Sequence, residues 1–295
     1  MLKTNEPEQT WLNGRIKVIP SANSENEEII GYHSNGNPHF LYFMVNGQMH
    51  GLCRGWHENG QLSSEENFEH GKIQGIKKQW HSNDNLAEEW IYQNGLLQGR
   101  HQAWFEDGKL SLEDYFINDK PHGIRKEFFS SGTLKSVTKY NSGVMTGIRK
   151  IYFESGLLLT EEHYKNGKLH GSKKEWHPNG TLKIESFYLS NALDKVYRAW
   201  NENGVLIKQF TYQRGKINGI YNIWDKDGKL ILTKLYVRDV EVPSWIHDLI
   251  HTRKLRARHI LQIHNTAVRR ICLEHLGYAR FLVQLPHEVL DKNGG

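Results

Sequence analysis

Histidine is the residue type with the most obvious capacity for chemistry, since the chain holds 17 of them. A neutral imidazole binds metals, and it exchanges protons near neutral pH. Most of the conspicuous histidines recur at multiples of 24 residues, in two groups: His50, His122 and His170, and His57, His81 and His177. A metal site needs converging ligands, and no third ligand type accompanies either group. The sequence therefore indicates no metal site, and the repeat explains these histidines.

Nucleophilic catalysis finds no supporting motif. Cys53 and Cys272 lie far apart and outside any catalytic or metal-ligand spacing. There is no G-x-S-x-G elbow and no phosphate-binding glycine loop. Carboxylates recur with the same period as the histidines, which gives many equivalent positions where an active site needs a special one. We expect no catalytic residue, no cofactor and no enzymatic activity.

Basic residues near the C-terminus form the first candidate binding site. Residues 243–295 hold eight Lys/Arg against four Asp/Glu, a balance of +4. Such a cluster suits an acidic partner, whether protein, nucleic acid or lipid, although a solvated helix face is the alternative. The candidate residues are Arg253, Lys254, Arg256, Arg258, Arg269 and Arg270.

A second, weaker set of cations recurs at one repeat position. Neighbours two strands apart would be about 10 Å apart, a spacing that suits a phosphate backbone or an anionic membrane. The alternative is pairing with periodic glutamates. Residues 1–242 favour that alternative, because they hold 30 Lys/Arg against 29 Asp/Glu. The members of this set are Lys78, Lys126, Lys150, Lys174 and Arg198.

The element that positions all these residues is a repeat of 24 residues without insertions. An aromatic series contains Tyr32, Trp56, Trp80, Trp104, Phe128, Tyr152, Trp176, Trp200 and Trp224, and glycine follows four residues later in every copy except at Asp84. A second aromatic series contains Phe68, Tyr92, Phe116, Tyr140, Tyr164, Tyr188, Tyr212 and Tyr236, and a leucine series runs from Leu62 to Leu230. A period in the twenties is typical of stacked repeat proteins.

Each copy carries two turn signals, of the types Glu58-Asn59-Gly60 and Asn166-Gly167-Lys168. Asn-Gly between short runs rich in aromatic and aliphatic residues predicts a β-hairpin. We therefore expect a mainly β fold, an elongated array of about nine 24-residue hairpins over residues 29–242. A small α-helical cap is expected over residues 243–295.

The hairpin pattern also predicts a strand register. A short loop at Glu58–Gly60 would pair Trp56 with Leu62 and place both aromatic series and the leucine series on one face. The same register predicts one cross-strand ion pair in each of four copies: Lys77 with Glu89, His101 with Glu113, Arg149 with Glu161, and Lys173 with Glu185.

Both ends of the array are expected to differ from its interior, because a terminal repeat meets water on one side. Residues 1–28 are polar apart from Ile16–Ile19, which together with Trp11 suggests a degenerate capping strand. The pattern stops at Pro243, where Trp245, Ile246 and later apolar residues follow helical spacing. We expect these basic helices to cover the open edge of the last hairpin.

The unit Asn166–Gly180 resembles the MORN-repeat variant of bacterial proteins commonly labelled YwqK-family antitoxins. The resemblance covers about residues 29–237 and implies a repeat scaffold that binds proteins or membranes. Departures from the pattern are Asp84, Asp119, Asn191 and Lys195 at glycine positions. Asn and Asp tolerate the turn conformation, whereas Lys195 suggests a locally distorted copy.

The expected function is therefore a non-enzymatic protein-binding scaffold, and the resemblance adds an antitoxin or immunity partner of a toxin. One alternative is a module that binds nucleic acid or anionic membrane through the basic C-terminal helices. Another is enzyme or toxin activity in that same region. Two thiols and the absence of an apolar signal segment at the N-terminus suit a cytoplasmic protein.

Overall fold

A computed structural model describes residues 10–12, 16–20 and 26–243 of the 295-residue chain. The predicted helical cap lies outside these residues, as does much of the N-terminal segment. The chain divides into two compact units, each considered by itself below. The first unit is Met1–Leu158 with Tyr164–Gly167, and the second is Leu159–His163 with Lys168–Gly295.

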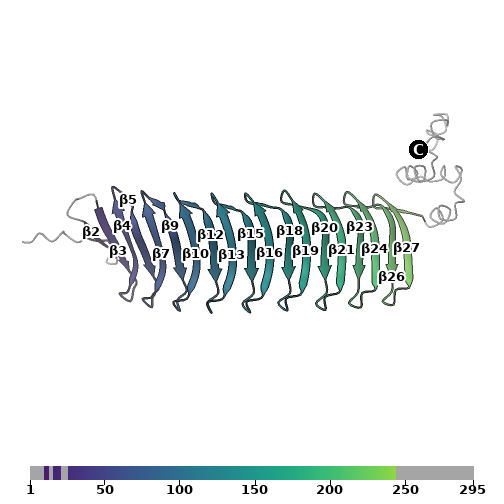
Figure 1. Cartoon of the computed structure of the whole chain (residues 1–295), viewed down its shortest axis with the longest axis horizontal. Coiled ribbons are helices and arrows are strands. Elements are labelled where there is room, and N and C mark those ends of the chain that lie inside the picture. The colour runs from purple at the N-terminus through teal and green to yellow at the C-terminus, as the bar shows by residue number, and fades with distance from the viewer. Residues whose placement is uncertain (1–9, 13–15, 21–25, 244–295) are drawn as a thin grey trace, which may run out of the picture. The chain divides into compact units, whose positions relative to one another are not determined.

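The first unit contains strands β1 to β18, which pair in antiparallel fashion with their neighbours in the chain (Figure 1). Their bounds are β1 (Thr10–Leu12), β2 (Ile16–Pro20), β3 (Asn26–Tyr32), β4 (Pro38–Val45), β5 (Gln48–Met49), β6 (Gly51–Trp56), β7 (Leu62–Glu69), β8 (Lys72–Ile73), β9 (Gly75–Trp80), β10 (Leu86–Gln93), β11 (Leu96–Leu97), β12 (Gly99–Trp104), β13 (Leu110–Ile117), β14 (Lys120–Pro121), β15 (Gly123–Phe128), β16 (Leu134–Asn141), β17 (Val144–Met145) and β18 (Gly147–Tyr152).

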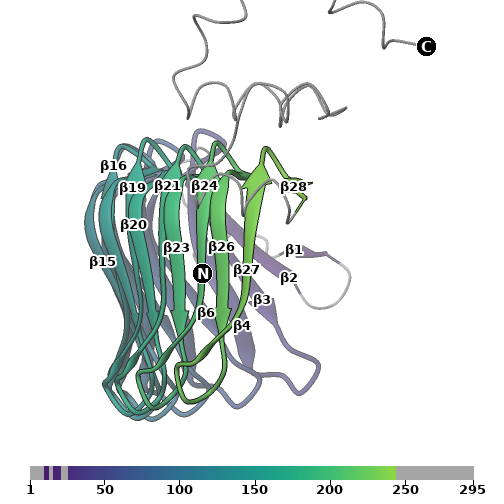
Figure 2. The same ribbon diagram turned by 90° about the vertical axis from the view of Figure 1, so that its right-hand side faces the viewer.

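The second unit repeats the same arrangement, and Figure 2 shows its long strands one behind another with turns at both ends. Strand β19 (Leu158–Lys165) contributes residues to both units. The other strands are β20 (Lys168–Trp176), β21 (Leu182–Leu189), β22 (Ala192–Leu193), β23 (Lys195–Trp200), β24 (Leu206–Gln213), β25 (Lys216–Ile217), β26 (Gly219–Trp224), β27 (Leu230–Val237) and β28 (Val240–Val242).

The expected β-hairpin repeat is confirmed, with one addition. A typical copy has a six-residue strand such as β6, an eight-residue strand such as β7, and a two-residue strand such as β8. The short strand pairs with the end of the long one, through Phe68 opposite Ile73. It leads the chain into the next hairpin, so consecutive hairpins are joined by a hydrogen-bonded connection.

The predicted register is correct at the loop and wrong beyond it. Trp56 lies opposite Leu62, as expected, but a β-bulge follows and Gly55 lies opposite Ser64. The extra residue shifts every later pair by one position. The same shift occurs in seven further hairpins, β3–β4, β9–β10, β12–β13, β15–β16, β20–β21, β23–β24 and β26–β27. The predicted couples Lys77 with Glu89, His101 with Glu113 and Lys173 with Glu185 are therefore not cross-strand neighbours, and the couple Arg149 with Glu161 stays a prediction.

The bulge also separates the series that were expected to share a face. By strand alternation Trp56 points away from the side of Gly55, and Ser64 lies opposite Gly55. The face of Ser64 and Phe68 therefore carries the second aromatic series, and the first aromatic series does not share it. Most buried side chains lie on the Phe68 face, including Cys53, His101, Asp114, Thr138, Glu162 and Ser186.

In most hairpins after β3–β4, a glycine at the start of the first long strand lies directly opposite the second aromatic series, as Gly51 does opposite Phe68 and Gly219 opposite Tyr236. These glycines have positive φ, from 71° at Gly147 to 124° at Gly99. Lys195 adopts the same conformation with φ 63° and keeps the register opposite Tyr212. The expected distortion of this copy is therefore absent, and the cost is confined to one strained residue.

Pro243 marks the end of the repeat pattern in the sequence. It occupies the next position of this glycine series, 24 residues after Gly219. A proline ring fixes φ near −65°, so the residue cannot adopt the positive φ found at the start of the hairpins from β6–β7 to β26–β27 for which this position is a glycine or Lys195. Strand β28 accordingly pairs with β27 only through Val242 opposite Leu235 and the two pairs before it.

The repeated histidines and asparagines connect consecutive hairpins. The Nε2–H of His57 donates to the main-chain oxygen of Trp80 at 2.9 Å, and the equivalent bonds of His33, His81 and His177 have the same length to within 0.1 Å. Asn59 bonds the main-chain oxygen of Ser82 at 2.8 Å. Each such bond satisfies a main-chain acceptor of the next hairpin. The histidines His57, His81 and His177, which were considered as metal ligands, therefore have a structural role.

Candidate functional site

In each unit a row of side chains crosses the strands through the middle of the Phe68 face, and we call it the central row of that unit. Within a unit, each member lies beside the next on an adjacent strand. In the first unit it contains Cys53, Glu66, Lys77, Trp90, His101, Asp114, Arg125 and Thr138, and in the second Glu162, Lys173, Ser186, Tyr197, Phe210, Tyr221 and Lys234.

The central row of the first unit is a chain of charged contacts. Lys77 Nζ lies 2.9 Å from Glu66 Oε2 and 5.8 Å from the ring centroid of Trp90. Trp90 stacks on His101 with centroids 5.4 Å apart and an interplanar angle of 1°. The lysine therefore contacts both a carboxylate and the face of an aromatic ring.

His101 and Asp114 are the most buried pair in this row, 9% and 4% exposed. The Nδ1–H of His101 donates to Asp114 Oδ1 at 2.8 Å, and Arg125 Nη1 lies 3.6 Å from Asp114 Oδ2. His101 Nε2 lies 3.9 Å from Glu88 Oε2 and makes no hydrogen bond within residues 26–243. A histidine oriented by a carboxylate also occurs in catalytic triads, but there Nε2 contacts a nucleophile, and here its neighbour is a second carboxylate.

The central row of the second unit begins with charge and continues as stacked aromatic rings. Lys173 Nζ lies 3.1 Å from Glu175 and 3.3 Å from Glu162. Burial acts to lower the pKa of Lys173, but the hydrogen bond and charge of Glu175, helped by Glu162, outweigh it and raise that pKa. This cation is therefore held by its neighbours within the same face.

Three rings follow in the same row of the second unit. Tyr197 stacks on Phe210 with centroids 5.4 Å apart and an interplanar angle of 6°, and Phe210 stacks on Tyr221 at 4.2 Å and 10°. Burial raises the pKa of the Tyr197 phenol, and the charge of Glu175 adds to the shift. Stacked rings of this kind fix one another and present a rigid surface.

The weaker set of sequence-predicted cations lies on the opposite face, and most of it is ion-paired. We call this set with its glutamates the lysine row. Lys78 lies 3.7 Å from Glu89, Lys126 3.8 Å from Glu113, Lys174 3.8 Å from Glu185, and Arg198 3.1 Å from Glu185. Lys150 also interacts with another residue. The alternative of pairing with the glutamates accounts for this part of the surface.

The main set of candidates, the six basic residues Arg253, Lys254, Arg256, Arg258, Arg269 and Arg270, lies outside the described residues. Of the two cysteines, Cys53 is a free, buried thiol of the central row whose pKa is raised by burial. It behaves as a small apolar side chain and not as a reactive thiolate.

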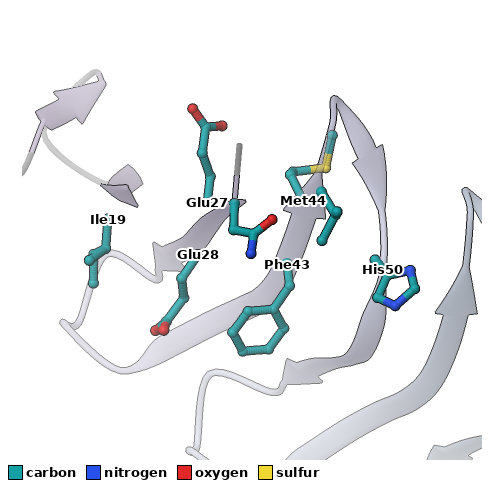
Figure 3. Close-up of a pocket in the computed structure, with 8 residues that line it drawn as sticks. Ile19, Glu27, Glu28, Phe43, Met44 and His50 are labelled. Carbon is teal, nitrogen blue, oxygen red and sulfur yellow. The ribbon is translucent and has the colours of Figure 1, made fainter. Parts of the chain in front are cut away.

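A pocket of about 370 Å³ lies at the N-terminal strands of the first unit, lined among others by Ile19, Glu27, Glu28, Phe43 and His50. Figure 3 shows that the side chains of Glu27 and Glu28 point away from each other. This follows from strand alternation, because Glu27 lies opposite Met44 and Glu28 opposite Phe43. The two carboxylates therefore do not form one site.

Neither a metal site nor a membrane-spanning helix occurs in the described part of the chain. No group of three or more His, Cys, Asp or Glu residues there has an arrangement that could hold a metal ion. Within the same residues, no helix has the length and apolar character needed to span a membrane.

Comparison with known families identifies the repeat. Residues 49–70, 121–142, 145–166 and 169–189 each match the family model described as MORN repeat variant. This is a MORN-repeat protein. The four matches lie in register with the 24-residue period, and the unmatched hairpins have similar strand bounds.

No curated protein matches the chain of this MORN-repeat protein. Among solved structures, 75% of the chain aligns with 15% of a chain in the crystal structure of TcdB2-TccC3-Cdc42, at 11% identity and a TM-score of 0.19. In the crystal structure of TcdB2-TccC3-TEV, 14% of one chain aligns with 71% of the MORN-repeat protein, at 10% identity and a TM-score of 0.18. Scores this low carry no argument about fold or function.

Proposed function

We propose that this MORN-repeat protein is a non-enzymatic scaffold that binds another protein through its central row. MORN repeats are often protein- or membrane-binding modules. The observation that carries the proposal is the composition of the central row, where Trp90, His101, Arg125, Tyr197 and Tyr221 lie in line within their units. Aromatic residues and arginine are the side chains enriched in protein interfaces.

The lysine row favours a protein over a polyanion as the partner. A cation that already contacts a glutamate gains less from a phosphate, because the phosphate must compete with that carboxylate. Lys78, Lys126, Lys174 and Arg198 are all in this situation. The alternative of nucleic acid or anionic membrane thus rests on the C-terminal cations, as does the second alternative of enzyme or toxin activity in residues 243–295.

The resemblance to YwqK-family proteins narrows the proposed partner to a toxin, for which this chain would serve as antitoxin or immunity protein in the cytoplasm. A scaffold with a rigid row of aromatic and charged side chains suits that role, because inhibition needs tight contact and no chemistry. The resemblance alone supports this narrower proposal.

The test is capture of a partner from extract of the source cells by the immobilised full-length chain, followed by mass spectrometry. Two matched pairs of variants compare the faces: Tyr221→Ala with Ile220→Ala, and Trp90→Ala with Ile76→Ala. Ile220 and Ile76 are 48% and 51% exposed on the face opposite the central row. We expect a protein that the wild type and both isoleucine variants retain and at least one central-row variant loses.

Two results would contradict the proposal. One is retention of the same proteins by all variants, which would remove the central row from the interface. The other is the absence of any retained protein together with salt-sensitive binding of DNA, RNA or anionic liposomes, which would favour the polyanion alternative.

A further inference from the structure

A second pocket lies on the central-row face of the second unit, with a volume of about 360 Å³. Ala199, which is 8% exposed, lies between Ile184 on one neighbouring strand and Lys208 on the other. We call this hollow the Ala199 pocket. The lining residues used below are Lys183, Ile184, Tyr197, Ala199, Ile207 and Lys208.

The pocket depends in part on the small residue at position 199. Five of the equivalent positions carry larger side chains that would fill this space, namely Gln79, Glu127, Ile151, Glu175 and Ile223, whereas Gly31, Gly55 and Ala103 are small as well. Two bulges enlarge the effect. One lies between Leu182 and Ile184, with Lys183 as the extra residue, and the next lies between Leu206 and Lys208. A bulge redirects side chains, so both residues of each bulge line the pocket.

The pocket has a rigid aromatic side. Tyr197 lines it and stacks on Phe210, which in turn stacks on Tyr221. A ring held in this way loses little conformational freedom when a ligand contacts it.

The charge at the pocket is unmatched. Lys183 and Lys208 both line it, and neither forms an ion pair with any residue in the described ranges of the chain. On the other face of the sheet, Glu185 is shared by two cations, Lys174 of β20 and Arg198 of β23. Glu202 is the one acidic residue of the lining, so the balance at the pocket is positive.

We propose that the Ala199 pocket receives an aromatic side chain of the partner protein together with an adjacent carboxylate, as an acidic peptide segment presents them. The ring would lie on Ala199 and Ile184 beside Tyr197, and the carboxylate would face Lys208 and Lys183. This inference rests on the proposed function, because it assigns one contact within the proposed protein interface.

The first unit offers a built-in control. Ala103 holds the equivalent position there and is 9% exposed, but its cross-strand neighbours are Glu88 and Leu112. Leu112 stands in place of Lys208, and Glu88 stands in place of Ile184, so the charge beside Ala103 is negative and repels an anion. The two alanines thus share size and backbone position and differ in the sign of the neighbouring charge.

The experiment measures binding of small probes to the full-length chain by NMR titration. N-acetylphenylalanine supplies a ring and a carboxylate, and its neutral amide is the control for charge. We expect saturable binding of the acid, about tenfold tighter than that of the amide. Ala199→Gln, which introduces the residue found at position 79, should abolish binding, whereas Ala103→Gln should leave it unchanged. Lys208→Gln should remove the preference for the acid.

Four results would overturn the inference: no saturable binding of the acid, equal binding of acid and amide, equal loss in Ala199→Gln and Ala103→Gln, or tighter binding of AMP than of N-acetylphenylalanine. The last would point to nucleotides instead of peptide. Capture of the partner separates this inference from the proposed function. A partner retained by Ala199→Gln as well as by wild type leaves the scaffold intact and removes the pocket from its interface.

Discussion

The two units share one framework and differ in what fills their central rows. Strand bounds, bulges and positive-φ glycines are the same in both. In the first unit the row runs through the contacts of Lys77, His101, Asp114 and Arg125, whereas in the second it passes from Lys173 to the stacked rings. Main-chain pairing and turn chemistry therefore carry the fold, and the central row is free to vary.

The difference also changes how the members of the row depend on one another. A buried charge is stable only with its partner, so loss of one residue leaves another uncompensated. A stacked ring that loses its neighbour loses contact area but no electrostatic partner. The charged row should therefore respond more strongly than the aromatic row to single substitutions.

The largest expected effect is that of Asp114→Ala in the first unit. The change leaves the Nδ1–H of His101 and the guanidinium of Arg125 without their shared acceptor in a buried position. The free energy of unfolding should fall by about 3–5 kcal/mol, measured by denaturant titration. Glu113→Ala is the matched control, since Glu113 lies one residue away on the lysine row with 37% side-chain exposure, and it should cost less than about 1 kcal/mol.

Phe210→Ala tests the aromatic row of the second unit. Removing the ring between Tyr197 and Tyr221 should lower the free energy of unfolding by about 3 kcal/mol, measured in the same way. Ile220→Ala removes an apolar side chain that is 48% exposed and should have a much smaller effect. A cost for Phe210→Ala that exceeds the cost of Asp114→Ala would contradict the ranking of the two rows.

Lys195→Gly tests whether the framework is as uniform as the register indicates. Glycine adopts positive φ without strain, so Lys195→Gly should raise the free energy of unfolding by about 1 kcal/mol. Part of this gain is offset because glycine gives the unfolded chain more conformational entropy. The reverse change Gly171→Lys should destabilise, because a Cβ there would lie 3.1 Å from the Cβ of His163. If both variants changed the free energy of unfolding in the same direction, the positive φ at this position would not determine the stability of the hairpin.

The smallest effect concerns alkaline pH. Burial raises the pKa of Tyr197 above its unfolded value of about 10, so the unfolded chain releases this proton first. Stability should therefore be complete below that pH and decrease as the pH rises above it. The raised pKa of Lys173 acts in the same direction. Tyr197→Phe should flatten the decrease in thermal unfolding temperature above about pH 10, and an unchanged slope would contradict the assignment.

The sequence was sufficient to predict the hairpins, because glycine and aromatic residues at a fixed spacing specify turns and strands directly. It was also sufficient for the pairing of Trp56 with Leu62. It was insufficient for the β-bulge, which inserts one residue without changing the 24-residue period. The predicted ion pairs of Lys77 with Glu89, His101 with Glu113 and Lys173 with Glu185 failed for that single reason.

The candidate sites were harder to predict, since they depend on neighbours across strands. The histidine bonds to the next hairpin had a signal, namely imidazoles just after the aromatic residue at multiples of 24 residues. The Ala199 pocket had none, because its existence depends on which side chains the two bulges bring beside one alanine. The basic residues of the C-terminal region remain a prediction.

The proline at position 243 has a consequence for how such chains change length. The described hairpins after β3–β4 begin at a residue with positive φ, and the sequence pattern ends where a residue incapable of it appears. The number of repeats is thus marked by one residue in the sequence. Duplication of a 24-residue segment upstream of that residue would lengthen the protein by one hairpin while leaving its terminus, and whatever follows it, unaltered.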